Sequence, residues 1–376
     1  MVWGFFLPRP QSDKEKVMDQ KELAYAKQGA LATKNGDCFQ RVIRRCLRCQ
    51  GGDAPPQSAL KRITPALVTV SLFMVMLMCF SASALAKTRT LKKGPAIVLV
   101  AFGTTTQARE TYDVFAEQLK NELPEQWRNV PISWAYTSEI VRERANKQFA
   151  EKGVSERYRS LPQVLASLED QGYRQIAIQS LHIFPGQEYE DMEQEIAAFR
   201  GLGLRIEYGG TLLHTWERAF EAVSAVAPEF LSSSAGCTVL VTHGTPETFS
   251  GANNTYLGLD RYLNLKYSTV FVGTVEGVLT RDQALEKAKA CTPKRVRIVP
   301  FMYVAGDHVM NDIMGEKVDE DGVLSWAMEL RSAGVSVEKV STDYQGRTVF
   351  KGLGFYPEIN RIFIEQLLEG LERLNQ

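Results

Sequence analysis

Short apolar segments alternate with longer amphipathic segments from Lys93 to the C-terminus. In the first half, each apolar segment precedes a stretch in which apolar residues recur every three or four positions. The apolar segments cover residues 96–102, 132–137, 175–184 and 204–210. Strands that alternate with longer helices are typical of parallel βαβ units with right-handed crossovers. The pattern therefore predicts an α/β fold built on a parallel sheet.

The same order of segments begins again after the small polar stretch at residues 232–236. Three segments of the second half resemble segments of the first: TVLVTHGT (238–245) and IVLVAFGT (97–104), VFVGTVEG (270–277) and SWAYTSEI (133–140), VRIVPFMYVAGDH (296–308) and IAIQSLHIFPGQE (176–188). Correspondences in one order indicate a duplication. We therefore predict two similar α/β domains, at residues 94–234 and 237–376, each a parallel sheet flanked by helices.

A secretory signal peptide is predicted at residues 61–86. Lys61 and Arg62 precede an apolar run, and small residues end at Ala86. The run is shorter than the roughly 20 residues of a membrane-spanning helix. We expect cleavage near Ala86, a periplasmic mature protein and no stable membrane anchor, with an uncleaved anchor as the alternative. Residues 1–60 are interpreted as a misassigned start or a disordered extension.

Charge and cysteine content limit the possible functions of the chain that follows the predicted signal peptide. The full chain is 44% apolar and carries 44 basic and 44 acidic residues. Residues 1–86 hold 12 of the basic and 6 of the acidic residues, so the remainder has 32 and 38 and a net charge of −6. A nucleic-acid partner is not expected, because affinity for phosphates depends on basic surfaces. Only Cys237 and Cys291 remain after cleavage, which allows a single disulfide.

The duplication shows where the two halves differ in chemistry. His243 aligns with Phe102, and His308 aligns with Glu188. With Glu276, the two histidines fall at or beyond the carboxyl ends of predicted parallel strands, where open α/β sheets bind ligands. Two imidazoles and a carboxylate can hold a divalent first-row metal with positions left for exchange. The alternative is that each histidine is a polar residue satisfied by its neighbours.

Several segments resemble the anaerobic class II cobaltochelatases, which insert Co2+ into sirohydrochlorin for cobalamin synthesis. The resemblance extends from about Pro95 to the C-terminus. It rests on VAFGTT, QGYRQIAIQSLHIFPGQEYE, THGT, VGTVEG, PFMYVAGDHVMNDI and GLGFYPEINRIFIEQL. The family resemblance implies two similar domains that hold the macrocycle in the cleft between them. Most members are cytoplasmic, so a predicted export signal is a departure from the family.

The resemblance also implies roles for individual residues. His243, Glu276 and His308 are expected to ligate the metal, and His243 also to act in catalysis. Glu188 and His182 are expected as catalytic polar groups across the cleft. Metal enters a tetrapyrrole only as two N–H protons leave, so a carboxylate with a raised pKa in a partly dry cleft suits the proton acceptor. For His182, a packed and hydrogen-bonded structural role is the alternative.

Sirohydrochlorin carries eight carboxylates, which require cationic or N–H donors. Thr104 and Thr105 in the first turn, together with Arg142, are the candidates for binding them. For Arg142, the alternative is a solvated helix residue.

Other functions stay open. Fe2+ and Ni2+ suit the same ligands as Co2+, and a surplus histidine could ligate haem. The main alternative to an enzyme is a periplasmic metal or haem carrier that uses the same cleft without turnover. A coenzyme-binding protein is disfavoured because FGTTT lacks the glycine spacing of dinucleotide-binding motifs. A homo-oligomer is compatible with the sequence.

Overall fold

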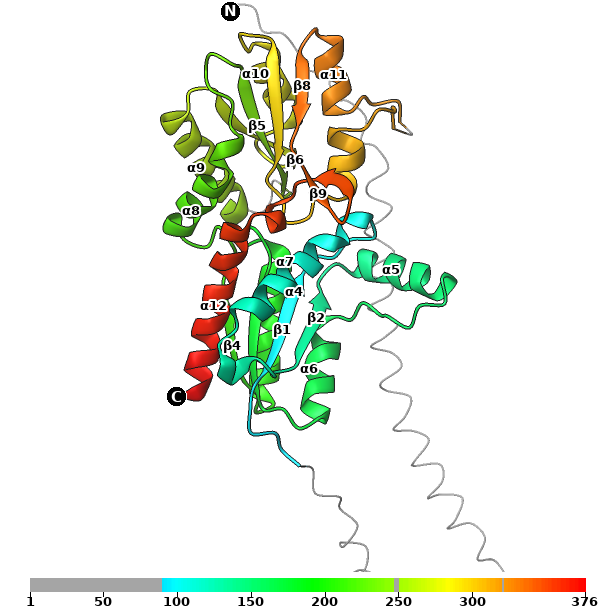
Figure 1. The fold of residues 1–376 in the computed structure, drawn as a ribbon, viewed down its shortest axis with the longest axis vertical. Coiled ribbons are helices and arrows are strands. Elements are labelled where there is room, and N and C mark those ends of the chain that lie inside the picture. Colours follow the sequence, from blue (N-terminus) through cyan, green and yellow to red (C-terminus); the bar gives the residue numbers. More distant parts are fainter. Residues whose placement is uncertain (1–89, 247–249, 320) are drawn as a thin grey trace, which may run out of the picture. The chain divides into compact units, whose positions relative to one another are not determined.

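The computed structural model describes residues 90–246, 250–319 and 321–376 (Figure 1). Residues 88–376 form one compact unit. The predicted extension (1–60) and signal peptide (61–86) lie outside the described residues. Within the described part, no helix combines the length and the apolarity needed to cross a membrane.

Two parallel four-stranded sheets form the framework of the chain. The first has the order β2-β1-β3-β4 and consists of β1 (Ala96–Ala101), β2 (Ile132–Tyr136), β3 (Gln175–Ser180) and β4 (Arg205–Gly209). The second has the order β6-β5-β7-β8 and consists of β5 (Cys237–Gly244), β6 (Val270–Glu276), β7 (Arg295–Pro300) and β8 (Ser336–Lys339). The two orders are equivalent, which confirms the predicted α/β class with a repeated parallel sheet. The predicted domain limits stay a prediction.

Helices connect the strands of both sheets. The first half contains α4 (Glu110–Glu122), α5 (Glu139–Glu151), α6 (Leu161–Asp170), α7 (Gln187–Gly201) and α8 (Trp216–Val226). The second half contains α9 (Ser250–Lys266), α10 (Arg281–Lys289), α11 (Trp326–Ser332) and α12 (Pro357–Asn375). Many begin at a capping hydroxyl: Ser138, for example, accepts a hydrogen bond from the backbone N–H of Val141. Side-chain caps of this kind fix the point at which a loop becomes a helix.

The central strand β1 is apolar throughout because it is covered on both faces. All six of its residues are buried, and they belong alternately to two hydrophobic clusters. Parallel sheets with helices on both faces have such continuous apolar strands. The next residue, Phe102, is the first one exposed, so the strand ends with an apolar ring outside the core.

The last helix, α12, packs on the sheet of the first half, although the sequence prediction places it in the second domain. It contacts β3 and β4 and lies beside β4 in Figure 1. Arg373 forms an ion pair with Glu207 at 2.9 Å between Nε and Oε2. At its start, Asn360 accepts a hydrogen bond from the Tyr303 hydroxyl at 3.0 Å. The helix therefore ties the two halves together.

Strand β7 is shorter than its apolar pattern indicates. It ends at Pro300, whereas the predicted segment continued to His308. Residues 301–303 remain buried because they pack under the segment that precedes α12: Leu353 donates its backbone N–H to Met302, and Gly354 donates to Tyr303. His308 therefore lies well beyond the carboxyl end of β7. The apolar residues that suggested a longer strand belong to a buried loop.

A disulfide and an antiparallel hairpin complete the second half. Cys237, at the start of β5, is bonded to Cys291, and their Cα atoms are 6.1 Å apart. The two cysteines that the prediction retains in the mature protein therefore form its single allowed disulfide. The hairpin of β9 (Ser341–Tyr344) and β10 (Arg347–Phe350) was not predicted.

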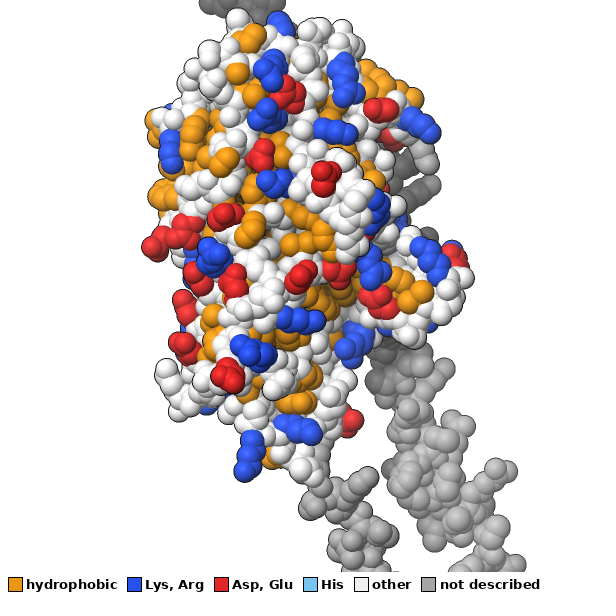
Figure 2. Space-filling model, viewed as in Figure 1, with side chains coloured by type: hydrophobic (Ala, Val, Ile, Leu, Met, Phe, Trp, Pro, Cys, Tyr) orange, Lys and Arg blue, Asp and Glu red, His pale blue; other side chains and the backbone are white. Residues whose placement is uncertain are grey.

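The exposed surface carries both signs of charge. On the face shown in Figure 2, basic and acidic side chains are interspersed with hydrophobic ones. Several of the charges are paired across elements, such as Arg297 with Glu338 at 2.8 Å between Nη2 and Oε2. Ion pairs at a solvent-accessible surface contribute little to stability individually.

Candidate metal and tetrapyrrole site

The carboxyl ends of the two sheets meet each other. The ring of Phe102, after β1, lies 6.3 Å from the ring of His243 in β5, measured between centroids. Nearby, the loop after β7 approaches the turn after β1, and a Cβ added at Gly306 would lie 3.2 Å from the Thr104 hydroxyl oxygen. Residues that are far apart in the sequence are thereby brought to one place. It is the edge at which open α/β sheets bind ligands.

Two imidazoles lie next to each other at this edge. The ring centroids of His243 and His308 are 4.9 Å apart, in an edge-to-face arrangement. His243 is held in place by Gly244, which has a positive φ of 83° and closely approaches β6. A Cβ at Gly244 would lie 1.6 Å from the Glu276 carbonyl oxygen, so only glycine fits there.

His308 reaches the site from a helical turn. It immediately precedes the π-helical turn Val309–Ile313, a kind of turn that is often found at functional sites. Its Nδ1 lies 2.6 Å from Oδ2 of Asp312, one turn further on. With Nδ1–H donating to the carboxylate, Nε2 keeps its lone pair. Carboxylates that orient metal-binding histidines in this way are common in metal sites.

The environment of His243 also favours a free lone pair on Nε2. Its Nδ1 lies 3.2 Å from the carbonyl oxygen of Gly244, so Nδ1–H can donate to that oxygen. Burial lowers the pKa of His243, and His308 lowers it further, while the Gly244 hydrogen bond and the Glu276 charge act in the opposite direction. The net effect favours the neutral imidazole, which is the form that binds a metal.

The third predicted ligand, Glu276, is at the end of the neighbouring strand. It pairs with Gly244 in the sheet, one residue beyond His243, and its side chain is exposed. Successive side chains of a strand point to opposite faces, so this register does not by itself put Glu276 on the face of His243. Within the described ranges, no group of three or more His, Cys, Asp or Glu side chains is arranged to hold a metal ion. The structure brings together the two imidazoles of the predicted ligand set. Metal binding by all three residues stays a prediction.

Glu188 and His182 lie together in the first half, linked by Thr137. Glu188 is in the first turn of α7, and burial raises its pKa, whereas a hydrogen bond from Thr137 opposes this effect. The Thr137 hydroxyl lies 3.2 Å from Nε2 of His182, and the Ser180 hydroxyl lies 2.8 Å from Nδ1. Burial lowers the pKa of His182 to about 4, so its ring is neutral near pH 7.

The predicted carboxylate-binding groups are partly used within the protein. Arg142 is half-buried and donates from Nη1 to the backbone carbonyls of Tyr136 and Thr137, each at 2.6 Å, so part of its hydrogen-bonding capacity is used within the protein. Thr104 is buried, and its hydroxyl lies 3.0 Å from that of Thr106. Thr105 is half-buried between them. Their role in binding substrate stays a prediction.

Three polar residues of the site were missed by sequence reasoning. Thr137 and Ser180 stand at strand ends like many polar residues, and only the fold joins them through His182. Asp312 carried a usable signal, because a carboxylate four positions after a histidine lies on the same side of a helical turn.

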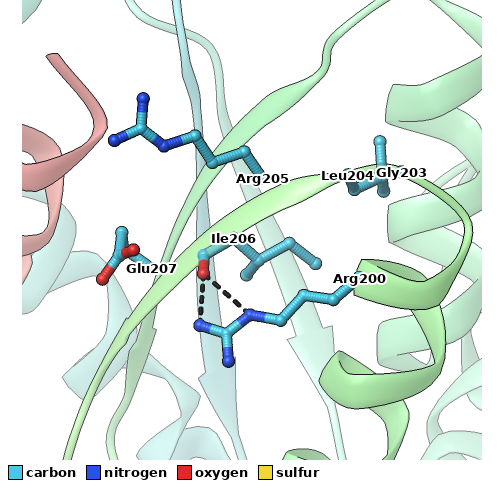
Figure 3. A pocket seen from close by; sticks show the side chains of 6 residues that line it. All are labelled: Arg200, Gly203, Leu204, Arg205, Ile206 and Glu207. Atoms are coloured by element: carbon cyan, nitrogen blue, oxygen red, sulfur yellow. Dashed lines mark hydrogen bonds between the residues drawn. The ribbon is translucent and has the colours of Figure 1, made fainter. Parts of the chain in front are cut away.

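One hollow of the surface lies away from these residues. It has a volume of about 400 Å3 and is lined by Arg200 and residues 203–207 (Figure 3). These residues join the end of α7 to the start of β4. They lie toward the amino ends of the strands, whereas the imidazoles lie toward the carboxyl ends. Arg200 already donates to the carbonyl oxygen of Ile206. The hollow therefore adds no chemical group to the site.

Comparison with known proteins identifies relatives along most of the described chain. The family model described as Cobalt chelatase (CbiK) matches residues 95–372. Sirohydrochlorin cobaltochelatase of Salmonella typhimurium is 30% identical over 210 residues, which cover 56% of this chain and 73% of that protein. Sirohydrochlorin cobaltochelatase CbiKC of Nitratidesulfovibrio vulgaris is 29% identical over 265 residues, which cover 68% and 86% respectively. The solved structure of SirB from Bacillus subtilis with Fe3+ is 16% identical, with a TM-score of 0.49, and the match covers 74% of this chain and 95% of that one.

The neutral, partly buried ring of His182 predicts a pH-dependent stability. The pKa of His182 is lower in the folded protein, at about 4, than its ordinary value of 6.5. Below pH 6.5 the unfolded chain therefore binds more protons, and stability falls until about pH 4, by about 3 kcal/mol at most. We expect His182→Gln to flatten this part of the stability curve, measured by urea unfolding from pH 8 to 4. The exposed His214→Gln serves as the control; an equal effect from both variants would contradict the assignment.

The paired imidazoles predict a two-histidine metal site. His243→Ala and His308→Ala should each weaken Co2+ binding strongly, and the double variant should lose little more, because the two act on one ion. Asp312→Asn should weaken binding about tenfold by freeing the His308 ring. Isothermal titration with Co2+ measures these effects, and thermal unfolding checks folding.

Asp307→Asn is the matched control for Asp312, since Asp307 accepts a hydrogen bond from the Asn311 side chain rather than from His308. His308 would be structural if His308→Ala bound Co2+ as tightly as the parent protein but unfolded at a lower temperature.

Proposed function

Since this chain belongs to the cobalt chelatase (CbiK) family, we propose that it inserts Co2+ into sirohydrochlorin, the activity that its relatives' names state for them. The observation that carries the proposal is the pair of adjacent imidazoles, His243 and His308, at the edge where the two sheets meet. Both rings use Nδ1 in hydrogen bonds to the protein, which leaves Nε2 for an ion. Neutral imidazoles hold a divalent ion and exchange it more readily than a set of thiolates does.

The ring of Phe102 suits a planar macrocycle. It is 43% exposed although it follows a wholly buried strand, and it lies beside His243. Aromatic rings favour offset stacking on other flat π-systems. A tetrapyrrole stacked on Phe102 would lie next to the imidazoles, so that an ion released by them has a short path to the pyrrole nitrogens.

Metal insertion also requires a proton acceptor. Each ion that enters the ring replaces two N–H protons, and these must pass to the protein or to water. Glu188 is suited to accept a proton because burial raises the pKa of its carboxyl, while Thr137 and Arg142 keep the rise in check. A base with a pKa closer to neutral transfers protons more efficiently than an ordinary surface carboxylate.

The proposal predicts a Co2+ insertion rate above the spontaneous one. With protein purified from expression of the full chain, the absorbance of cobalt-sirohydrochlorin should rise faster than in protein-free buffer, and Glu188→Gln should lower kcat about a hundredfold.

Phe102→Ala should raise KM for sirohydrochlorin without altering Co2+ affinity. The same assay with Fe2+ and Ni2+ ranks the metals.

Phe220 is the control for Phe102, because it is an exposed phenylalanine on α8 with a similar exposed fraction of 41%. Stoichiometric binding of Co2+ with no acceleration of insertion would instead identify a carrier.

We further propose that the protein is exported to the periplasm after cleavage near Ala86. The pattern of residues 61–86 supports this, and so does the Cys237–Cys291 disulfide, because disulfides persist mainly in oxidising compartments. The first residue of the protein recovered from its native cell should lie within a few positions of Lys87, as N-terminal sequencing will show. Recovery of intact residues 1–60 in the mature protein would contradict export by this signal.

A further inference from the structure

A chain of hydrogen bonds links Ser180, His182 and Thr137 next to Glu188 in the first half. Ser180 and His182 come from the end of β3, Thr137 from the end of β2, and Glu188 from the start of α7. The Ser180 hydroxyl contacts Nδ1 of His182 at 2.8 Å, and Nε2 contacts the Thr137 hydroxyl at 3.2 Å. The Thr137 hydroxyl in turn lowers the pKa of Glu188, as a hydrogen-bond donor to that carboxyl would.

The chemistry of these groups fixes the direction of each bond. An ionised carboxylate only accepts hydrogen bonds, so the Thr137 O–H donates to Glu188. Its oxygen then accepts from Nε2–H of His182, which leaves Nδ1 as an acceptor for the Ser180 O–H. The Ser180 oxygen also accepts the backbone N–H of His182 at 3.3 Å. Every donor in the chain then has an acceptor, and the ring is neutral with its proton on Nε2.

We propose that His182 is a positioning residue, whose neutral ring holds the Thr137 hydroxyl in the orientation that donates to Glu188. The proposal rests on the proposed function of Glu188 as the proton acceptor. His182 does not touch the substrate in this scheme; it acts through Thr137. The backbone of Thr137 is fixed as well, because its N–H donates to Ala101 and its carbonyl accepts from Arg142.

The consequence of this chain is a carboxylate that stays ionised in a half-buried position. Burial and the neighbouring charge of Asp191 favour the protonated form of Glu188, and Glu195 is close enough to interact with it as well. The Thr137 hydroxyl and the Arg142 charge favour the ionised form. Loss of the Thr137 hydrogen bond should therefore raise the pKa of Glu188 and leave less of the carboxylate available as a base at a given pH.

The test is the pH dependence of Co2+ insertion, measured on protein from the full chain. Thr137→Val removes the hydroxyl at nearly constant volume. It should shift the acidic limb of the plot of kcat against pH to higher pH by about one unit. His182→Leu should give a similar shift. The double variant should shift no further than the larger single one, because both residues act through one bond to Glu188.

Conservative variants separate positioning from packing. Thr137→Ser keeps the hydroxyl and should hold the limb near its parent position. His182→Gln keeps an N–H donor and should recover part of the shift seen with leucine. The control is Thr211→Val: Thr211 is buried, and its hydroxyl has no partner within the described residues. A purely structural His182 would alter thermal unfolding in these variants without moving the limb.

A readout without turnover separates this inference from the proposed function. The pKa of Glu188 is measured by carbon-13 NMR of protein labelled at the glutamate carboxyl carbon, with the signal assigned by Glu188→Gln. If the parent protein does not accelerate insertion, the proposed function fails, while a raised pKa of Glu188 in Thr137→Val still supports the hydrogen-bond chain. Should His182→Leu fail to fold, Thr137→Val decides. An unchanged pKa of Glu188 in Thr137→Val overturns the inference.

Discussion

The close approach of the two sheet edges is the constraint on which the site depends. Gly306 lies against Thr104, where a Cβ would be crowded, and Gly244 lies against the carbonyl of Glu276, where a Cβ has no room. These two contacts bring the loop after β7 to the turn after β1 and hold the end of β5 beside β6. Helix α12 supports the arrangement from outside, since it starts at the second half and packs on β3 and β4.

The arrangement divides the chemistry between the halves. The second half supplies two imidazoles, each with a hydrogen-bond partner at Nδ1. The first half supplies the exposed ring of Phe102 and Glu188, the proton acceptor that we propose. In the proposed function, different elements thus supply the metal ligands, the ring on which the tetrapyrrole stacks and the proton acceptor.

Sequence reasoning predicts the framework well, because burial on both faces makes parallel strands apolar throughout. The duplicated segments also located His243 and His308 at equivalent places, and the structure sets them side by side. The apolar pattern did not show where β7 ends, because residues 301–303 are buried outside the strand, and His308 lies in a helical turn beyond it. Helix α12 falls within the predicted second domain and yet contacts β3 and β4 of the first sheet, because an amphipathic stripe does not indicate which surface it covers.

The supporting residues of the site were beyond sequence reasoning for a different reason. Thr137 and His182 are 45 positions apart, and their bond exists only because β2 and β3 flank β1. The register of β5 and β6 similarly places Glu276 opposite Gly244 rather than His243. The pairing between strands decides which side chains meet. The order of residues in the sequence does not specify that pairing.

The most direct test of a metal site shared by two imidazoles is a crystal structure of the protein with Co2+ bound. We expect Nε2 of both His243 and His308 within about 2.2 Å of one cobalt ion, at the distance typical of imidazole ligands to a divalent first-row metal. Cobalt bound elsewhere, with both rings still making only their present contacts, would contradict this site.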